Sequence, residues 1–317
     1  MGNEHEIRMV VATTHVDRHG EQFTKEDLEQ MAEDAQSSNH PRWLYWNHET
    51  TLPPIGHFDV ERVELREDGE YQLLSEGILF GEGWSEPANS DNVSGLDITF
   101  QEIDSILEPV VLSKDGYLVI TYDTINYKRD LVQPIIESLN ELVPTEEQIF
   151  RRKAEIPREV IWVLVAFAGG IIARFGEKAA DVITDTAVQF YKELNSRFAR
   201  ILELNPDVKP DVIFNVPIPN TSTVVEAAVE EANKDDLEKA WRSLPVVYAI
   251  ASHIINRCPP DHFADMKFLF NLQDHRWEIN YFSVRATEKI LLGPRYYQPE
   301  HPQYQRWKKV LKEVNAE

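Results

Sequence analysis

Alternation of apolar and polar residues dominates the first 130 residues, a pattern typical of strands that bury one face. It occurs at 7–13, 58–65, 71–80, 94–101 and 117–122. Turn-forming stretches separate several of these segments, for example REDGE at 66–70 and SKDG at 113–116. Many short strands broken by turns predict a small, mainly β, barrel-like domain over residues 1–130.

One helix is expected inside this β-rich segment, beginning after Thr24. Thr24 and Asp27 have the spacing of an N-terminal capping box, in which each side chain bonds to the backbone N–H of the other residue. Apolar residues then recur at helical spacing, at Leu28, Met31, Ala32 and Ala35. We therefore predict an amphipathic helix that buries this stripe.

Residues 131–205 change to patterns that favour helix. The sequence predicts a short helix capped at Thr145, an apolar helix at 160–173 and a long amphipathic helix from about 177 to 204. Asn205 and Pro206 end the last of these. This part of the chain is therefore expected to be a helical connector.

The remaining residues, 206–317, mix strand and helix patterns. Strands are predicted at 212–218 and 223–229, a helix at 235–257, a hairpin at 267–272 and 277–285, and a short terminal helix. We expect a C-terminal α/β domain here. The predicted fold class is accordingly α+β, with a barrel-like N-terminal domain (1–130), a helical connector (131–205) and the α/β domain (206–317).

A step in charge supports a boundary near the middle of the chain. Residues 1–150 hold 31 Asp and Glu against 9 Lys and Arg, which accounts for the whole formal charge of −22. Nucleic-acid binding requires clustered cationic side chains, so we do not expect a nucleic-acid partner. An acidic surface instead favours basic protein or peptide partners, or simply solubility.

Cysteine and histidine usage limits the chemistry further. Cys258 is the single cysteine, so the chain cannot form an intramolecular disulfide or a cysteine metal cluster. Residues 1–6 lead directly into a strand pattern, so we expect no cleavable signal peptide and a reducing cytoplasm as the setting. Six of the ten histidines lie within the first 57 residues, but without metal-ligand spacing, so neither a metal nor a cofactor is predicted.

The run VIWVLVAFAGGIIA (160–173) is strongly apolar over 14 residues. A membrane-spanning helix needs about 20 apolar residues, so this length favours a helix buried in a core or between subunits. Gly169 and Gly170 would permit close helix approach. Two alternatives stay open: a homo-oligomer formed through residues 160–204, and a less favoured membrane association, which the basic residues 151–153 would assist.

Three stretches together resemble a known family: VDRHGEQFTKEDL (16–28), WLYWNHETTLPPIGHFDVERVEL (43–65) and DGEYQLLSEGILF (68–80). They are similar to the prohead maturation proteases of tailed phages, serine proteases whose fold is related to the herpesvirus assembly protease. The resemblance covers about residues 7–125. It implies an aromatic-rich strand that ends in a catalytic histidine, a Pro-Ile-Gly turn into the next strand, and a later strand that carries the nucleophilic serine.

Within this resemblance, His48 matches the catalytic histidine, and SGLDITF (94–100) matches the nucleophile strand. Asp97, however, stands where the family has serine, and Thr99 stands where it has glycine. The acyl-enzyme route needs a hydroxyl or thiol whose proton the histidine takes, and a carboxylate does not supply one. Ser94 falls on the opposite face of the strand from Asp97, and Thr99 lies about 6–7 Å further along the same face.

The resemblance and the lost serine predict a degenerate, inactive relative that acts as a binding or assembly module for a protein or peptide. In it, Asp97 forms an ion pair with His48. A first alternative is an active serine-type endopeptidase, with His48 as base and Thr99, another hydroxyl near 94–99 or an Asp97-activated water as nucleophile. A second is a membrane-associated sensor or adaptor that uses the apolar helix at 160–173. If the resemblance does not hold, His48 is an ordinary half-buried histidine.

Overall fold

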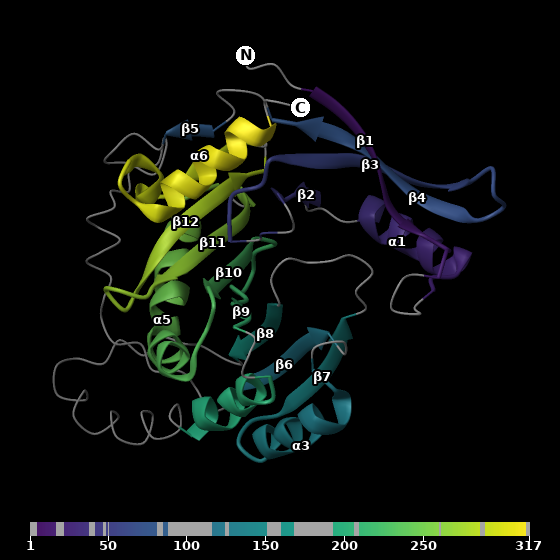
Figure 1. Cartoon of the computed structure of the whole chain (residues 1–317). Helices are drawn as coiled ribbons and strands as arrows, with labels where there is room; N and C mark the ends of the chain where they lie inside the picture. Colours follow the sequence, from purple (N-terminus) through teal and green to yellow (C-terminus); the bar gives the residue numbers. More distant parts are fainter. Residues whose placement is uncertain are drawn as a thin grey trace, which may run out of the picture.

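A computed structural model of the chain contains two β-sheets with helices packed against them (Figure 1). The residues that it describes are 5–16, 22–37, 42–46, 49, 51–80, 85–87, 116–123, 127–150, 160–167, 193–205, 209–259, 261–285 and 289–314. The predicted fold class of mixed α and β structure is confirmed at this level.

The smaller sheet has four antiparallel strands in the order β1-β4-β3-β2. These are β1 (His5–Thr13), β2 (Arg42–Leu44), β3 (Gly56–Leu65) and β4 (Tyr71–Leu79). Helix α1 (Lys25–Ser37) packs on one face, and its Leu28 and Ala32 are buried with Leu73 of β4. The sheet is open, because β1 and β2 are its two edges, so the expected barrel-like closure is wrong for the described strands.

The predicted capping box begins α1. The backbone N–H of Thr24 donates to the Asp27 carboxylate at 2.8 Å, and the backbone N–H of Asp27 donates to the Thr24 hydroxyl at 3.1 Å. Two N–H groups at the start of the helix therefore have acceptors that the sequence already identified.

Loss of this cap should cost a measurable part of the stability of the smaller sheet. We expect Thr24→Ala to lower the free energy of unfolding by about 1 kcal/mol, and Thr24→Ser to restore most of it, because serine keeps the accepting hydroxyl. Urea denaturation followed by circular dichroism measures the difference. Glu33→Ala, on the exposed side of the same helix, is the control. Equal effects of Thr24→Ala and Glu33→Ala would contradict the capping role.

The larger sheet has nine strands in the order β5-β13-β12-β11-β10-β9-β8-β6-β7. It is mixed, because β6–β7, β8–β9, β10–β11 and β5–β13 pair in parallel and the other neighbours pair antiparallel. The strands are β5 (Ser85–Pro87), β6 (Gly116–Asp123), β7 (Thr145–Phe150), β8 (Val160–Phe167), β9 (Asp211–Asn215), β10 (Val224–Val229), β11 (Phe263–Asn271), β12 (Arg276–Val284) and β13 (Lys289–Leu292).

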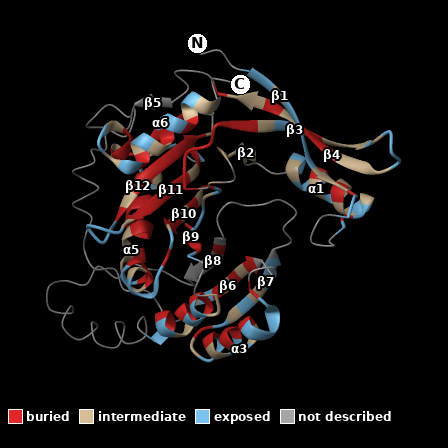
Figure 2. Cartoon of the chain, in the orientation of Figure 1, coloured by how far each residue is buried: buried red, intermediate tan, exposed pale blue. Residues whose placement is uncertain are grey.

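The main core lies on one face of this sheet. Helices α3 (Arg129–Asn140) and α5 (Lys234–Asn256) and a helical stretch at 193–203 pack their apolar side chains there. Trp241 of α5 is buried, and its ring centroid lies 5.5 Å from that of Phe198 and 4.9 Å from that of Phe214. Figure 2 shows the resulting concentration of buried residues along β10–β12 and the inner side of α5.

The opposite face of the same sheet carries a second core. The 3₁₀ turn η2 (Pro294–Tyr297) and helix α6 (Pro302–Val314) pack against β12 and β13 there, and α6 lies beside β12 in Figure 1. Leu52, Ile55 and Phe80, which precede or follow strands of the smaller sheet, belong to the same cluster. This face of the larger sheet therefore joins the first and the last parts of the chain.

The helical connector predicted for 131–205 is partly wrong. The predicted helix at Thr145 is strand β7, and the apolar run begins with β8, which pairs with β6 on one side and β9 on the other. Ile161 and Val163 of β8 are fully buried. A short apolar run fits a buried strand as well as a buried helix, and the β-branched residues of this run favour the strand.

Strands of all three predicted segments belong to the larger sheet, since β6 comes from the first, β7 and β8 from the second and β9–β13 from the third. The end of the predicted long helix is confirmed at 193–203, whereas residues 168–192 lie outside the described residues. Within the described part of the chain, no helix combines the length and the apolar character that crossing a membrane requires.

Candidate functional site

The four site residues predicted from the sequence, His48, Ser94, Asp97 and Thr99, all lie outside the described residues. Their mutual geometry, including the predicted ion pair between His48 and Asp97, stays a prediction. The described neighbours of His48 in the chain are Trp43–Trp46 on one side and Glu49 and Thr51 on the other. The candidate site is therefore built from what these neighbours contact.

Trp43, in β2, bonds to a carboxylate of the larger sheet. Its indole N–H donates to Oδ2 of Asp265 in β11. The Ser283 hydroxyl in β12 donates to the same oxygen at 2.8 Å, and the backbone N–H of Asp265 donates to that hydroxyl at 2.8 Å. Burial raises the pKa of Asp265 above its ordinary value, although the bonds from Trp43 and Ser283 oppose the shift.

Tyr45 covers a buried ion pair between Glu226 and Lys267, two residues along β11 from Asp265. Register places Glu226, Lys267 and Tyr281 side by side on neighbouring strands, so their side chains share one face. Lys267 is 3% exposed, and its ammonium lies 2.5 Å from a Glu226 carboxylate oxygen. The same ammonium lies 5.2 Å from the ring centroid of Tyr45 and 5.7 Å from that of Tyr281.

These contacts determine the protonation states of Lys267, Tyr45 and Tyr281. Burial alone would lower the pKa of Lys267, but the Glu226 carboxylate raises it above its ordinary value, so the ammonium is retained at neutral pH. Burial raises the pKa of both Tyr45 and Tyr281, whose hydroxyls lie 2.9 Å apart. Neither phenol is therefore a base at neutral pH, and Lys267 is not a neutral nucleophile.

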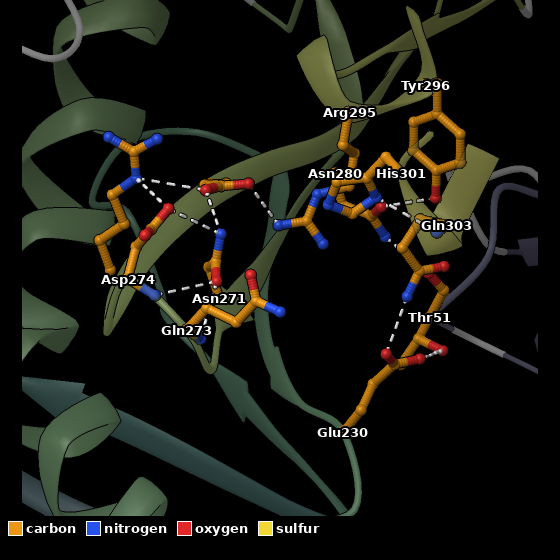
Figure 3. Close-up of polar contacts among 12 residues, drawn as sticks. Thr51, Glu230, Asn271, Gln273, Asp274, Asn280, Arg295, Tyr296, His301 and Gln303 are labelled. Atoms are coloured by element: carbon orange, nitrogen blue, oxygen red, sulfur yellow. Dashed lines mark hydrogen bonds and ion pairs between the residues drawn. The ribbon is translucent and has the colours of Figure 1, made fainter. Parts of the chain in front are cut away.

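A third group of contacts joins the residues after His48 to the end of the chain. The Thr51 hydroxyl donates to Oε1 of Glu230 at 2.6 Å, and the Gln303 amide donates to Oε2 of Glu230 at 2.8 Å (Figure 3). Arg306 donates to Glu49 at 2.9 Å and to Glu230 at 2.7 Å. These contacts connect the turn after β10 with α6 through residues 49 and 51.

The backbone of Thr51 is held as well. The Asn280 amide donates to the Thr51 carbonyl at 2.8 Å, and the Tyr296 hydroxyl donates to the Asn280 side-chain oxygen at 2.7 Å (Figure 3). Asn280 is the extra residue of a register shift in β12 and is fully buried. The bulge turns an amide toward the incoming segment, which a regular strand would not do at this position.

The other polar cluster in Figure 3 has a structural role. Asn271 accepts hydrogen bonds from the backbone N–H groups of Gln273 and Asp274 and donates to Glu278 at 2.7 Å. Glu278 also accepts from Arg295 at 2.6 Å, and although burial would raise the pKa of this carboxyl, Arg295 and its other partners lower it. These bonds fix the turn between β11 and β12 and attach η2 to it.

The described groups around the segment bind one another rather than forming a catalytic set. The Ser283 hydroxyl donates to the Asp265 carboxylate and accepts from the backbone N–H of the same residue. His57 is buried in β3, with its ring against Trp43 and its Nδ1 2.7 Å from Asp59. Among the described residues, no group of three or more His, Cys, Asp or Glu side chains is placed to hold a metal.

Sequence reasoning missed Asp265, Lys267 and Glu226. The signal for two of them was present in strand β11, FADMKFLFN, where an acidic and a basic residue interrupt an apolar run. Lysine and aspartate are seldom buried unless they are paired, so a lysine in such a strand predicts a nearby carboxylate. The identity of that carboxylate, 41 residues earlier in the chain, had no sequence signal.

Comparisons of the chain with models of protein families, with curated proteins and with solved structures found no match. The resemblance to the prohead maturation proteases accordingly stays a proposal.

Proposed function

We propose that this chain is a non-catalytic binding or assembly module with the fold of a prohead maturation protease in its N-terminal part. Its partner in this proposal is a protein or a peptide. The predicted loss of the nucleophile, with Asp97 at the serine position, removes the acyl-enzyme route that the resemblance would otherwise imply.

One observation carries the proposal. The residues that flank His48 in the chain, Trp43 and Tyr45 before it and Glu49 and Thr51 after it, each bond to a residue beyond 225. Their partners are Asp265, Tyr281, Arg306 and Glu230. A protease that cleaves an extended peptide needs an open groove beside its catalytic histidine. In this chain, the side chains on both sides of that histidine are instead committed to intramolecular contacts.

A charge argument supports a protein or peptide partner. The acidic surplus lies entirely within residues 1–150, and many of its described members are exposed on α1 and the β3–β4 turn, including Glu26, Glu33, Asp34 and Glu67. Such a surface increases the association rate with basic partners and repels nucleic acid. The module therefore recognises basic protein segments in this proposal.

The absence of peptidase chemistry is directly testable. We expect purified protein to show no self-cleavage by intact mass over days, no hydrolysis of casein and no labelling by a fluorophosphonate probe. His48→Ala should behave identically, because in this proposal no nucleophile depends on the imidazole. A matched control, His253→Ala, alters a histidine of α5 remote in sequence from the site.

The alternative function has a distinct outcome in the same assays. If the wild-type protein is labelled or cleaves, and His48→Ala abolishes the signal whereas His253→Ala retains it, the chain is an active serine-type endopeptidase. Mapping the labelled peptide would then decide whether Ser94, Thr99 or another hydroxyl is the nucleophile. That result would remove the present proposal.

A further inference from the structure

Helix α6 is shared between the two ends of the chain. Its Trp307 and Val310 are 3% and 4% exposed, and they pack in one hydrophobic cluster with residues of both halves. From the first half come Leu52, Ile55 and Phe80, and from the second come Tyr281, Ile290, Leu292 and Tyr296. The helix therefore belongs to one cluster with described residues of 43–46 and 52–55 and with residues of the larger sheet.

Arg306 supplies a charged contact of this attachment, beside the bond from Gln303 to Glu230. Its guanidinium bonds to Glu49 through Nε at 2.9 Å and to Glu230 through Nη1 at 2.7 Å. The side chains of Arg306, Glu49 and Glu230 are 23%, 19% and 20% exposed, respectively. One cation from α6 thus joins a carboxylate of the segment that contains His48 to a carboxylate of the sheet.

Without the Arg306 cation, the electrostatic interaction between the segment and the sheet would change from attraction to repulsion. Glu49 and Glu230 are both within hydrogen-bond distance of one guanidinium, so without it two carboxylates face each other across the junction. Like charges at such separations repel, and the repulsion acts between the segment and the sheet. Arg306 therefore contributes to the closure of this junction by keeping these two carboxylates neutralised.

The helix is also suited to detach. A 13-residue helix is marginally stable by itself in water, so α6 depends on the contacts just described. Helices outside the sheets, with fewer buried contacts than central strands, populate open states more often than those strands do. The exposed side of α6 is basic, with Lys308, Lys309 and Lys312, whereas the half of the chain that it holds is acidic.

We propose that α6 is a conformational lock, closed by Arg306, that holds the described residues of this segment, 42–46, 49 and 51–55, against the larger sheet. Its release frees Trp43 and Tyr45, together with the cluster around Leu52 and Ile55, from their contacts with the larger sheet. The opening is an intramolecular event and does not depend on the proposed function. A failure of the lock would therefore leave the absence of peptidase chemistry unaffected, and the reverse also holds.

Hydrogen–deuterium exchange of the full chain tests the lock. In Arg306→Ala, we expect exchange in peptides covering 42–46 and 51–55 to be about tenfold faster than in the wild type, because the closed state is less populated. Lys309→Ala is the matched control on the same helix, since Lys309 is 76% exposed and its Nζ lies 3.8 Å from Glu313. It should leave exchange in these peptides unchanged.

Two outcomes would overturn the lock. Either exchange in 42–55 stays at the wild-type rate in Arg306→Ala, or it rises equally in Lys309→Ala. If exchange becomes faster only in α6 and not in 42–55, the lock is also overturned, because the helix would then open without releasing the segment.

A second variant separates repulsion from general loss of packing. Adding Glu49→Gln to Arg306→Ala removes one of the two facing carboxylates, and we expect it to slow exchange in 42–55 back toward the wild-type rate. No recovery in the double variant would contradict the electrostatic closure.

If Arg306→Ala does not fold, the wild-type protein provides the test. Raising NaCl from about 0.05 M to about 0.5 M screens partly exposed ion pairs, so exchange in 42–55 should accelerate while exchange in β10 stays constant. Salt-independent exchange in 42–55 would overturn the lock.

Discussion

Glu226→Gln is expected to lower the free energy of unfolding by about 3 kcal/mol or more. The change leaves the Lys267 ammonium, which is 3% exposed, without its nearest counter-ion inside the sheet. Desolvation of an unpaired charge is among the largest penalties that a single substitution produces. Urea denaturation at neutral pH, followed by tryptophan fluorescence and by circular dichroism, measures the difference.

The matched variants separate charge burial from packing. Glu226→Met combined with Lys267→Met removes both charges and keeps most of the volume, so it should regain most of the lost stability. Glu313→Gln, which removes an exposed carboxylate 3.8 Å from Lys309, should change stability by less than about 0.5 kcal/mol. If Glu226→Gln costs no more than Glu313→Gln, the buried pair is not a determinant of stability.

The same pair predicts a pH dependence. The pKa of Lys267 in the folded protein is raised above its ordinary value, so folding favours the protonated form. The contribution is therefore complete at neutral pH and is lost only as pH rises above the ordinary lysine pKa of about 10.4 and through the folded value. The double methionine variant should lack this alkaline loss.

Trp241→Ala should have an effect of comparable size on the main core. We expect a loss of about 3–5 kcal/mol, because truncation of a buried tryptophan removes apolar contact and leaves a cavity. The indole of Trp241 is 1% exposed and packs between the ring of Phe198 in the helical stretch 193–203 and the ring of Phe214 in β9. It therefore holds three elements together.

Arg242→Ala is the control for this core variant, because it changes the next residue of α5 on the exposed side. Denaturant midpoints of both variants decide the comparison, and Trp241→Ala should be far lower. Trp241→Phe, which retains an aromatic ring, should lose less than Trp241→Ala. A difference between Trp241→Ala and Arg242→Ala of under about 1 kcal/mol would contradict the assignment of this residue to the centre of the core.

Local sequence patterns predicted much of the secondary structure. The capping box at Thr24 and Asp27, the hairpin across 66–70 and the hairpin of β11 and β12 are all confirmed. The helix predicted at 235–257 is α5, within a residue at each end. Each of these depends on residues a few positions apart, so the determining interactions are present in any short window of the chain.

The secondary structure was predicted wrongly where the local sequence does not distinguish a helix from a strand. Residues 160–167 are apolar enough for a buried helix or a buried strand, and pairing with β6 and β9 selected the strand. Residues 145–150 contain three Glu or Gln residues that favour helix, but parallel pairing with β6 selected β7 instead. Strand pairing supplies hydrogen bonds across long sequence separations, and these override weak intrinsic propensity.

In the candidate site, too, some features were visible in the sequence and others appeared only in the tertiary structure. The sequence alone determined that His48 follows an aromatic segment and that the acidic surplus lies in residues 1–150, whereas the placement of Asp97 at a serine position stays a prediction from the resemblance. Only the tertiary structure decided that Trp43 meets Asp265 and that Glu49 meets Arg306, across 222 and 257 residues. The physical reason is that such contacts depend on how two sheets and a terminal helix pack, which no local pattern encodes.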